Sequence, residues 1–273
     1  MKKLILLVAL IFLVAAACKE KKPVEFTRLG YYTPYQSYME NLKGKVKSVS
    51  ETNYWAIPEG ETYNKGAAIT AAELDSLTYT GNFVATFDES GDIVSCKWLD
   101  ENDKILSKWE ISKENNLMSR ADYMENDTAR AYHDLRCDAE GNIIEIEVYN
   151  APTDTMTSRV VIDRSLKGDT VFFRQFRYNG EPGNTTMDLY DINGNYLGYK
   201  SYDREGNYRS GSELTYHEDG TISGIKFFDK DGNIVAENEF STRLDEMGNP
   251  QTTLCKDKKG FAIFTERVYT YFE

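Results

Sequence analysis

The sequence predicts an all-β protein: an antiparallel β-meander of about fifteen strands in a curved or nearly closed sheet, with two short N-terminal helices. Turn residues recur at a nearly constant spacing through most of the chain. The segments between them alternate polar residues with aromatic or β-branched ones, which is the period of strands. Twisted open sheets rarely exceed ~10 strands without curling or splitting, so a meander of this length is expected to curve.

Charge and composition exclude several classes of protein. The 273 residues include 44 acidic and 32 basic side chains, which gives a net charge of -12 at pH 7. Nucleic acid is therefore not an expected partner, because binding to phosphates needs a basic surface. Hydrophobic residues make up 41% of the chain and aromatic residues 13%, so the chain can bury a core and neither disorder nor a coiled coil is expected.

Residues 1–17 are predicted to be a signal peptide, because two lysines precede an uncharged run, Leu4–Ala17, that ends in small residues. This run is too short to span a bilayer. The segment Val14–Cys18 resembles the lipobox of bacterial lipoproteins. The resemblance implies an acylated Cys18, a tether over 18–32, and a lipid-anchored protein of the bacterial cell envelope, at the outer membrane and facing the periplasm or the surface. An ordinary cleaved signal is the alternative.

Residues 33–81 are predicted to form an N-terminal capping region. Thr33–Gln36 has the pattern of a capping box with proline at the first helical position, which predicts a short helix near 34–41. Thr70–Glu73 has the same capping pattern and predicts a second short helix. A strand over Lys45–Trp55 is expected between them. Such a segment would cover the open edge of a repeat sheet.

Residues 82–273 are predicted to form a domain of repeated hairpins. The motif at Tyr190–Asn195 returns twelve residues later at Tyr202–Asn207, and the same frame extends from Gly91 to Gly260 with fourteen turns. In eight of the fourteen turns an Asp side chain can accept hydrogen bonds from turn amides, and in ten of them a Gly at the frame position can adopt positive φ, as in a type I turn with a G1 bulge. The clearest structural turns contain Asp191, Gly194, Asp203, Gly206, Asp229 and Gly232.

These Tyr-Asp-x-x-Gly-Asn units resemble the YD repeats of RHS-type bacterial proteins and, more loosely, MORN-type hairpin repeats. The resemblance covers Phe87 to about Phe272 and is clearest from Tyr190 to Asn233. It implies a β-meander with a structural or binding role. It carries no catalytic residues to this chain.

Cysteine spacing predicts buried thiols and no metal site. Cys96, Cys137 and Cys255 are an odd number, so at most one disulfide can form in an oxidising compartment, and none belongs to a CxxC pair. Asp229–Asn233 partly resembles a calcium loop but lacks the bidentate Glu of an EF-hand. We therefore expect no metal and no cofactor.

The expected function is non-enzymatic: a scaffold or binding module for a protein or a glycan. Turn and packing roles account for most Asp, Gly and Tyr residues, so the candidate binding residues lie in the insertion that the repeat does not explain, at Trp55, Glu61 and Tyr63. The alternative is an envelope hydrolase acting on glycan or peptide, in which carboxylates outside the turns would converge in a cleft.

Two further features bear on the envelope location. Asp-Ser/Thr-apolar triplets resemble the acceptor of O-glycosylation in some Gram-negative envelopes, at Ser76, Thr128, Thr155 and Thr170. A membrane-spanning barrel is the weaker reading of the meander, because charged strand residues interrupt any apolar band that would face lipid. These residues include Glu145, Glu147, Arg174 and Lys226.

Overall fold

A computed structural model describes residues 42–60, 62–76, 81–165 and 167–273, which form seventeen strands and one short helix. The elements are β1 (Val46–Glu59), β2 (Thr62–Ala68), α3 (Ala71–Ser76), β3 (Asn82–Phe87), β4 (Ile93–Leu99), β5 (Ile105–Glu114), β6 (Leu117–Glu125), β7 (Thr128–Cys137), β8 (Ile143–Asn150), β9 (Thr155–Arg164), β10 (Thr170–Arg177), β11 (Pro182–Tyr190), β12 (Tyr196–Tyr202), β13 (Tyr208–Tyr216), β14 (Ile222–Phe228), β15 (Ile234–Leu244), β16 (Pro250–Asp257) and β17 (Ala262–Tyr271).

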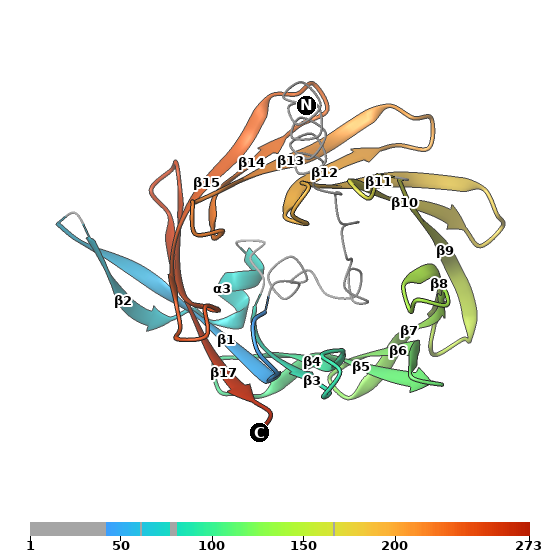
Figure 1. Ribbon diagram of the computed structural model, residues 1–273, viewed down its shortest axis with the longest axis horizontal. Helices are drawn as coiled ribbons and strands as arrows, with labels where there is room; N and C mark the ends of the chain where they lie inside the picture. The colour runs from blue at the N-terminus through green and yellow to red at the C-terminus, as the bar shows by residue number, and fades with distance from the viewer. Residues whose placement is uncertain (1–41, 61, 77–80, 166) are drawn as a thin grey trace, which may run out of the picture.

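The strands close into a barrel (Figure 1). From β3 to β17 each strand pairs antiparallel with the next in the chain, and β1 completes the ring by pairing with β17 on one edge and with β3 on the other. The predicted all-β antiparallel meander is confirmed, and the curved sheet is a closed one. The fifteen strands β3–β17 come from residues 82–273, whereas β1 and β2 come from the predicted capping region.

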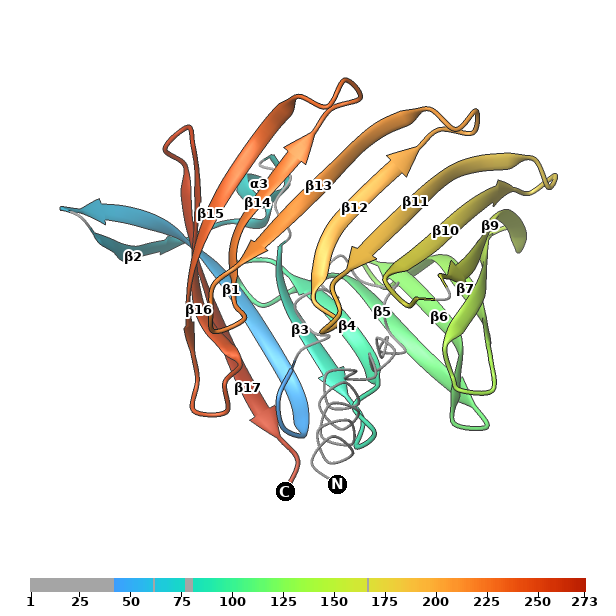
Figure 2. The ribbon, with the colours of Figure 1, turned by 45° about the horizontal axis from the view of Figure 1, so that its top comes forward.

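Strand β1 extends beyond the end of its partner β17, and this extension pairs antiparallel with β2. The two strands form a hairpin that projects from the ring (Figures 1 and 2). The predicted second helix is α3, which lies within the ring. Its capping box is formed: the Thr70 hydroxyl accepts from the Glu73 amide at 3.3 Å, and the Glu73 carboxylate accepts from the Thr70 amide at 2.9 Å. The helix predicted near 34–41 lies outside the described residues, as does Cys18.

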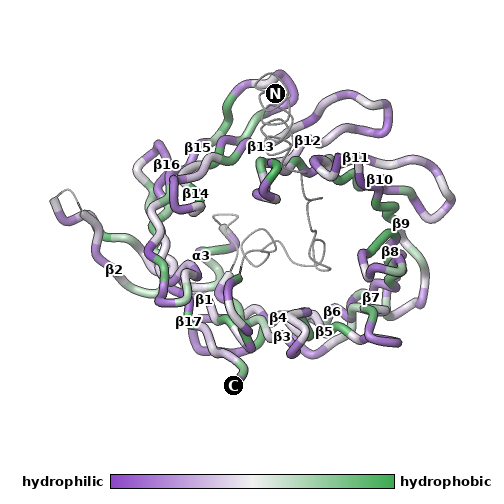
Figure 3. Tube along the Cα trace, viewed as in Figure 1, coloured by the Kyte–Doolittle hydropathy of each residue, from purple (hydrophilic) through white to green (hydrophobic). Residues whose placement is uncertain are grey.

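The turns follow the repeat frame. Gly194, Gly206 and Gly232 have φ angles of 87°, 85° and 81°, the left-handed region in which glycine has no steric cost. Asp191 accepts hydrogen bonds from the amides of Asn193 at 2.7 Å and Asn195 at 2.9 Å. Asp203 and Asp229 bind their turn amides in the same way. The residues of each hairpin therefore specify its turn geometry, and most of the outer hairpin ends are hydrophilic along the tube in Figure 3.

The two faces of the wall differ in chemistry. The face on which Ile263 contacts Ile69 and Leu74, beside α3, points into the barrel. By strand register this inward face carries most of the apolar residues, including those of the main core cluster. The outward face carries ion pairs instead, and these join Lys108 to Glu110, Arg120 to Asp122, Arg136 to Glu145, Lys226 to Glu237 and Lys65 to Glu266.

Along the ring the inward face has two parts. From β3 to β10, which we call the packed inner wall, Phe83, Ala121 and Ile146 are 2%, 0% and 3% exposed. From β12 to β16, the open inner wall, Leu214 and Phe227 remain half-buried. Cys96 and Cys255 are buried free thiols, as predicted, whereas the free thiol of Cys137 is only half-buried. Burial raises the pKa of the Cys96 thiol to about 12, so this thiol is unreactive.

Candidate functional site

A cavity of about 440 Å³ lies against the open inner wall at the end of the barrel that carries the β11–β12, β13–β14 and β15–β16 turns. Its lining combines aromatic and aliphatic side chains with hydroxyl groups and a guanidinium. The strand residues that line it include Tyr216, Ile222, Phe240, Thr242, Thr253 and Arg267. The turn residues Asn195, Asp219 and Gly248 also line it.

The β13–β14 turn, which forms one side of the cavity, departs from the repeat. His217 occupies the position that Asp holds in neighbouring turns, and its Nε2 lies 3.1 Å from the Phe240 carbonyl oxygen of β15. The Tyr216 hydroxyl donates to the Tyr196 carbonyl at 2.5 Å, which ties the other side of the turn to β12. Asp219 takes over the turn role, because its Oδ1 accepts from the Thr221 amide at 2.9 Å. The turn is thus attached to both adjacent hairpins.

Arg267, which lines the cavity from β17, belongs to a buried ion pair at the seam where β17 meets β1. Arg267 donates to one carboxylate oxygen of Glu51 from Nε at 2.8 Å and from Nη2 at 2.7 Å, and the two side chains are 9% and 4% exposed. The same seam holds Thr265, which donates to Asn53 Oδ1 at 2.8 Å. Such a pair is expensive to desolvate, so it specifies the β1–β17 register more than it stabilises the fold.

Two titratable groups on the inward face lie outside the cavity lining. Asp188 on β11 pairs in register with Val171 of β10 and Tyr199 of β12, so it stands between the two parts of the inner wall. Burial raises the pKa of Asp188 to about 7, against a hydrogen bond with Tyr196. On the packed inner wall, burial lowers the pKa of His133 to about 4, so this imidazole is neutral at pH 7.

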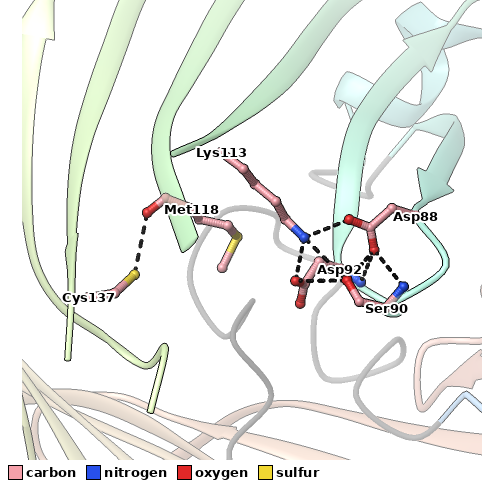
Figure 4. Close-up of polar contacts among 6 residues, drawn as sticks. All are labelled: Asp88, Ser90, Asp92, Lys113, Met118 and Cys137. Carbon is pink, nitrogen blue, oxygen red and sulfur yellow. Dashed lines mark hydrogen bonds and ion pairs between the residues drawn. The ribbon is translucent and has the colours of Figure 1, made fainter. Parts of the chain in front are cut away.

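On the packed inner wall, a polar cluster joins the β3–β4 turn to the end of β5 (Figure 4). Lys113, at the end of β5, donates to Asp88 at 2.6 Å, to Asp92 at 2.5 Å and to the Ser90 hydroxyl at 3.3 Å. Burial opposes ionisation of Asp88, but hydrogen bonds from Lys113 and Ser90 prevail and lower its pKa to about 2. The cluster joins two hairpins, so we interpret it as structural.

The candidate binding residues from the sequence lie away from the cavity. Trp55 packs edge-on against Phe261, with ring centroids 5.6 Å apart, and it contacts the small cluster around α3. Tyr63 lies on the projecting β2, where the Lys256 ammonium is 5.9 Å from its ring. Glu61 lies outside the described residues. Within the described ranges, no three His, Cys, Asp or Glu side chains form a group that could hold a metal ion.

Sequence reasoning missed the cavity, because its lining comes from five consecutive strands and several turns, and the repeat does not indicate which face of those strands points inward. One local signal was present. Among the strong repeats after Tyr190, His217 is the residue that breaks the Asp frame, and the turn it opens is the one that lines the cavity.

No protein-family model matches the sequence, and no curated protein matches it. Solved structures do match by fold. A porin-like protein from Bacteroides uniformis superposes with a TM-score of 0.51 at 6% identity, over 84% of this chain and 98% of that one. A porin-like protein from Bacteroides vulgatus gives 0.41 at 12% identity, over 83% and 98%. The TcdB2–TccC3 structure gives 0.19 at 12% identity, over 71% of this chain and 12% of that one.

At such low identity these likenesses concern the fold alone, and only the first has a TM-score high enough to support an argument. The chain therefore shares a porin-like β-barrel fold. The resemblance to YD repeats of RHS-type proteins, and lipidation at Cys18, stay predictions. Among the described residues no helix has the length and apolarity needed to cross a bilayer.

Proposed function

We propose that the protein is a non-enzymatic binding protein of the bacterial envelope, which holds a glycan or a segment of a protein inside its barrel. The observation that carries the proposal is the cavity on the open inner wall. Its volume of about 440 Å³ falls within the range of ~300–1,000 Å³ that is usual for ligand sites. Its lining has the usual composition as well, with apolar faces and a few convergent polar groups.

The charge pattern of the barrel supports a wall that faces water. Strands of transmembrane barrels point apolar side chains outward and polar ones inward, and this barrel has the reverse arrangement. Its outward face carries ion pairs such as Arg120–Asp122 at 2.9 Å and Arg136–Glu145 at 3.1 Å. Attachment to the membrane would then come from an acyl chain on Cys18. Cell fractionation tests this: Cys18→Ala should move the protein out of the membrane fraction, and unchanged membrane association would contradict lipidation.

Carboxylate positions support binding without catalysis. Asp219 lines the cavity and is engaged by its own turn, and Glu51, which pairs with the lining residue Arg267, does not itself line the cavity. Asp188 has the raised pKa typical of a general acid, yet it does not line the cavity. Among the described residues that line the cavity Asp219 is therefore the one carboxylate, whereas glycoside hydrolysis uses a pair of convergent carboxylates.

A retention experiment with three forms of the full-length chain tests the proposal. Wild-type protein in detergent, Phe240→Ala and Phe228→Ala would each be incubated with an envelope extract and washed. Phe228 is a matched control, because it is a half-buried phenylalanine of the neighbouring strand whose side chain points outward. Material retained by wild type and Phe228→Ala but lost from Phe240→Ala is expected. Equal retention by all three forms would contradict binding inside the barrel, and turnover of the retained material would favour the hydrolase.

A further inference from the structure

The chemistry of the cavity restricts the class of ligand, if the proposed function is correct. Tyr216 and Phe240 are half-buried aromatic residues on neighbouring hairpins, and both line the cavity. Aromatic faces of this kind attract the apolar face of a flat partner or of a sugar ring. Thr242 and Thr253 lie beside them, and their hydroxyl oxygens are 3.2 Å apart.

A purely apolar ligand such as an acyl chain does not fit this lining. It would cover the ion-paired Arg267 and the threonine hydroxyls without offering any hydrogen bond. Polar groups that lose water in this way cost free energy unless the ligand replaces those bonds. The lining therefore selects a ligand that presents hydroxyl groups along its edges.

An anionic ligand is not favoured either. Glu51 holds Arg267 through two nitrogens, at 2.8 and 2.7 Å, so most of its charge is already compensated. Hydrogen bonds from the Thr221 side chain and amide lower the pKa of Asp219, so the cavity also carries a carboxylate at pH 7. Together with the net charge of -12, these groups repel an acidic ligand.

We infer that the cavity binds a neutral glycan, with a sugar ring stacked on Phe240 and Tyr216 and with its hydroxyls bonded to Arg267, Thr242 and Thr253. Arg267 is the specificity-determining residue, since Glu51 fixes the plane of its guanidinium at the cavity wall. A planar guanidinium held by a carboxylate offers donors in a fixed geometry, which a lysine cannot reproduce. The β13–β14 turn sets the distance between the aromatic residues, because His217 and Tyr216 attach it to both adjacent hairpins.

The test uses full-length protein in detergent with three sets of immobilised probes: neutral oligosaccharides, uronic-acid-containing oligosaccharides and fatty acids. Wild type should bind one or more neutral oligosaccharides. Phe240→Ala and Arg267→Lys should each weaken that binding about tenfold or more, which corresponds to ~1.4 kcal/mol. Phe228→Ala should change it less than about twofold, because this side chain points outward. Circular dichroism and thermal unfolding of each variant check that the barrel is intact.

The outcomes separate the ligand class from the proposed function. Binding of acidic oligosaccharides or fatty acids, lost in Phe240→Ala, would overturn the neutral glycan and leave binding inside the barrel in place. Neutral glycan binding that survives Phe240→Ala and disappears in Trp55→Ala would overturn both. The absence of binding to any probe would overturn the neutral glycan and leave a segment of a protein as the ligand of the proposed function. Arg267→Lys with wild-type affinity would overturn the role given to the guanidinium.

Discussion

The packed and open inner walls come from the same hairpin repeat, yet they differ in what their inward residues do. On the packed inner wall, Phe83 and Ile146 are 2% and 3% exposed and belong to one continuous core cluster. On the open inner wall, Phe227 and Phe240 stay half-buried. The outward face is charged along both parts. The repeat thus determines how the strands of the wall are arranged. The inward residues determine whether a part of the wall forms a packed core or leaves a surface on which a ligand can bind.

Side-chain size accounts for part of the difference. The inward residues of β3 and β4 include Phe83 and Trp98, which face each other in register. In β12 and β13 the paired inward residues are Ser201 and Ser210. A Cβ atom added to Gly198 would come within 2.0 Å of the Ser212 carbonyl oxygen, so β12 and β13 also approach too closely there for any larger residue. Small residues therefore leave space inside the barrel beside these strands.

The largest expected effect is on the free energy of unfolding, and it appears when matched phenylalanines of the two walls are each replaced by alanine. Phe83→Ala should lower the free energy of unfolding by about 3–5 kcal/mol, because it leaves a cavity in a packed core. Phe240→Ala should cost about 1 kcal/mol, because its half-buried ring already borders empty space. Urea unfolding midpoints measure both. Equal losses would remove the distinction between the walls.

Removal of the Glu51 carboxylate from the β1–β17 seam should lower the stability of the barrel. Glu51→Leu leaves the buried Arg267 without its carboxylate and should destabilise the barrel by about 3 kcal/mol. The double variant Glu51→Leu with Arg267→Met should recover most of that loss, because both charges are then gone. Chemical denaturation of the single and double variants provides the test. A double variant as unstable as the single one would show that the pair itself stabilises the seam.

Asp188, at the boundary of the walls, should make stability depend on pH. Its folded pKa of about 7 lies above its ordinary value, so between pH 4 and pH 7 the folded state binds a proton that the unfolded state has released. Stability should therefore fall as pH rises through this window, by about 2 kcal/mol, allowing for residual hydration. Asp188→Asn should remove most of this slope. Wild-type and variant unfolding midpoints at pH 5 and 8 measure it, and identical slopes would contradict the assignment.

The smallest expected effect concerns α3, which adds local packing beside β17. Thr70→Ala removes the capping hydroxyl and should cost about 1 kcal/mol. Thr70→Ser keeps the oxygen and should cost less. Thermal unfolding compares the two, and equal shifts would mean that the hydroxyl does not cap the helix.

Local chemistry explains which parts of the structure the sequence predicted. Asp191 and Gly194 specify a turn with their own atoms, so the frame they define locates the strands on both sides of it. The capping box of Thr70 and Glu73 is equally local and located α3. Closure is different, because the β1–β17 seam joins residues such as Glu51 and Arg267 that lie 216 positions apart. Sequence periodicity separates the two faces of a strand but does not indicate which one turns inward.

The candidate binding site could not be predicted for the same reason. Phe240, Tyr216 and Arg267 line the cavity from β15, β13 and β17, and the repeat frame does not indicate that these residues face the interior of the barrel. The repeat does not explain Trp55, and in the structure this side chain packs against Phe261. Its predicted role in binding, with that of Tyr63 and Glu61, remains a prediction.

Hydrogen–deuterium exchange of the full-length protein, with and without a saturating ligand from the oligosaccharide panel, tests most directly whether the open inner wall is the binding surface. We expect added protection in peptides that cover 216–222 and 240–253, and unchanged exchange in peptides of the packed inner wall, 82–177. Protection confined to the projecting hairpin, 54–68, would contradict binding on the open inner wall. It would favour a binding site at Trp55 and Tyr63 instead.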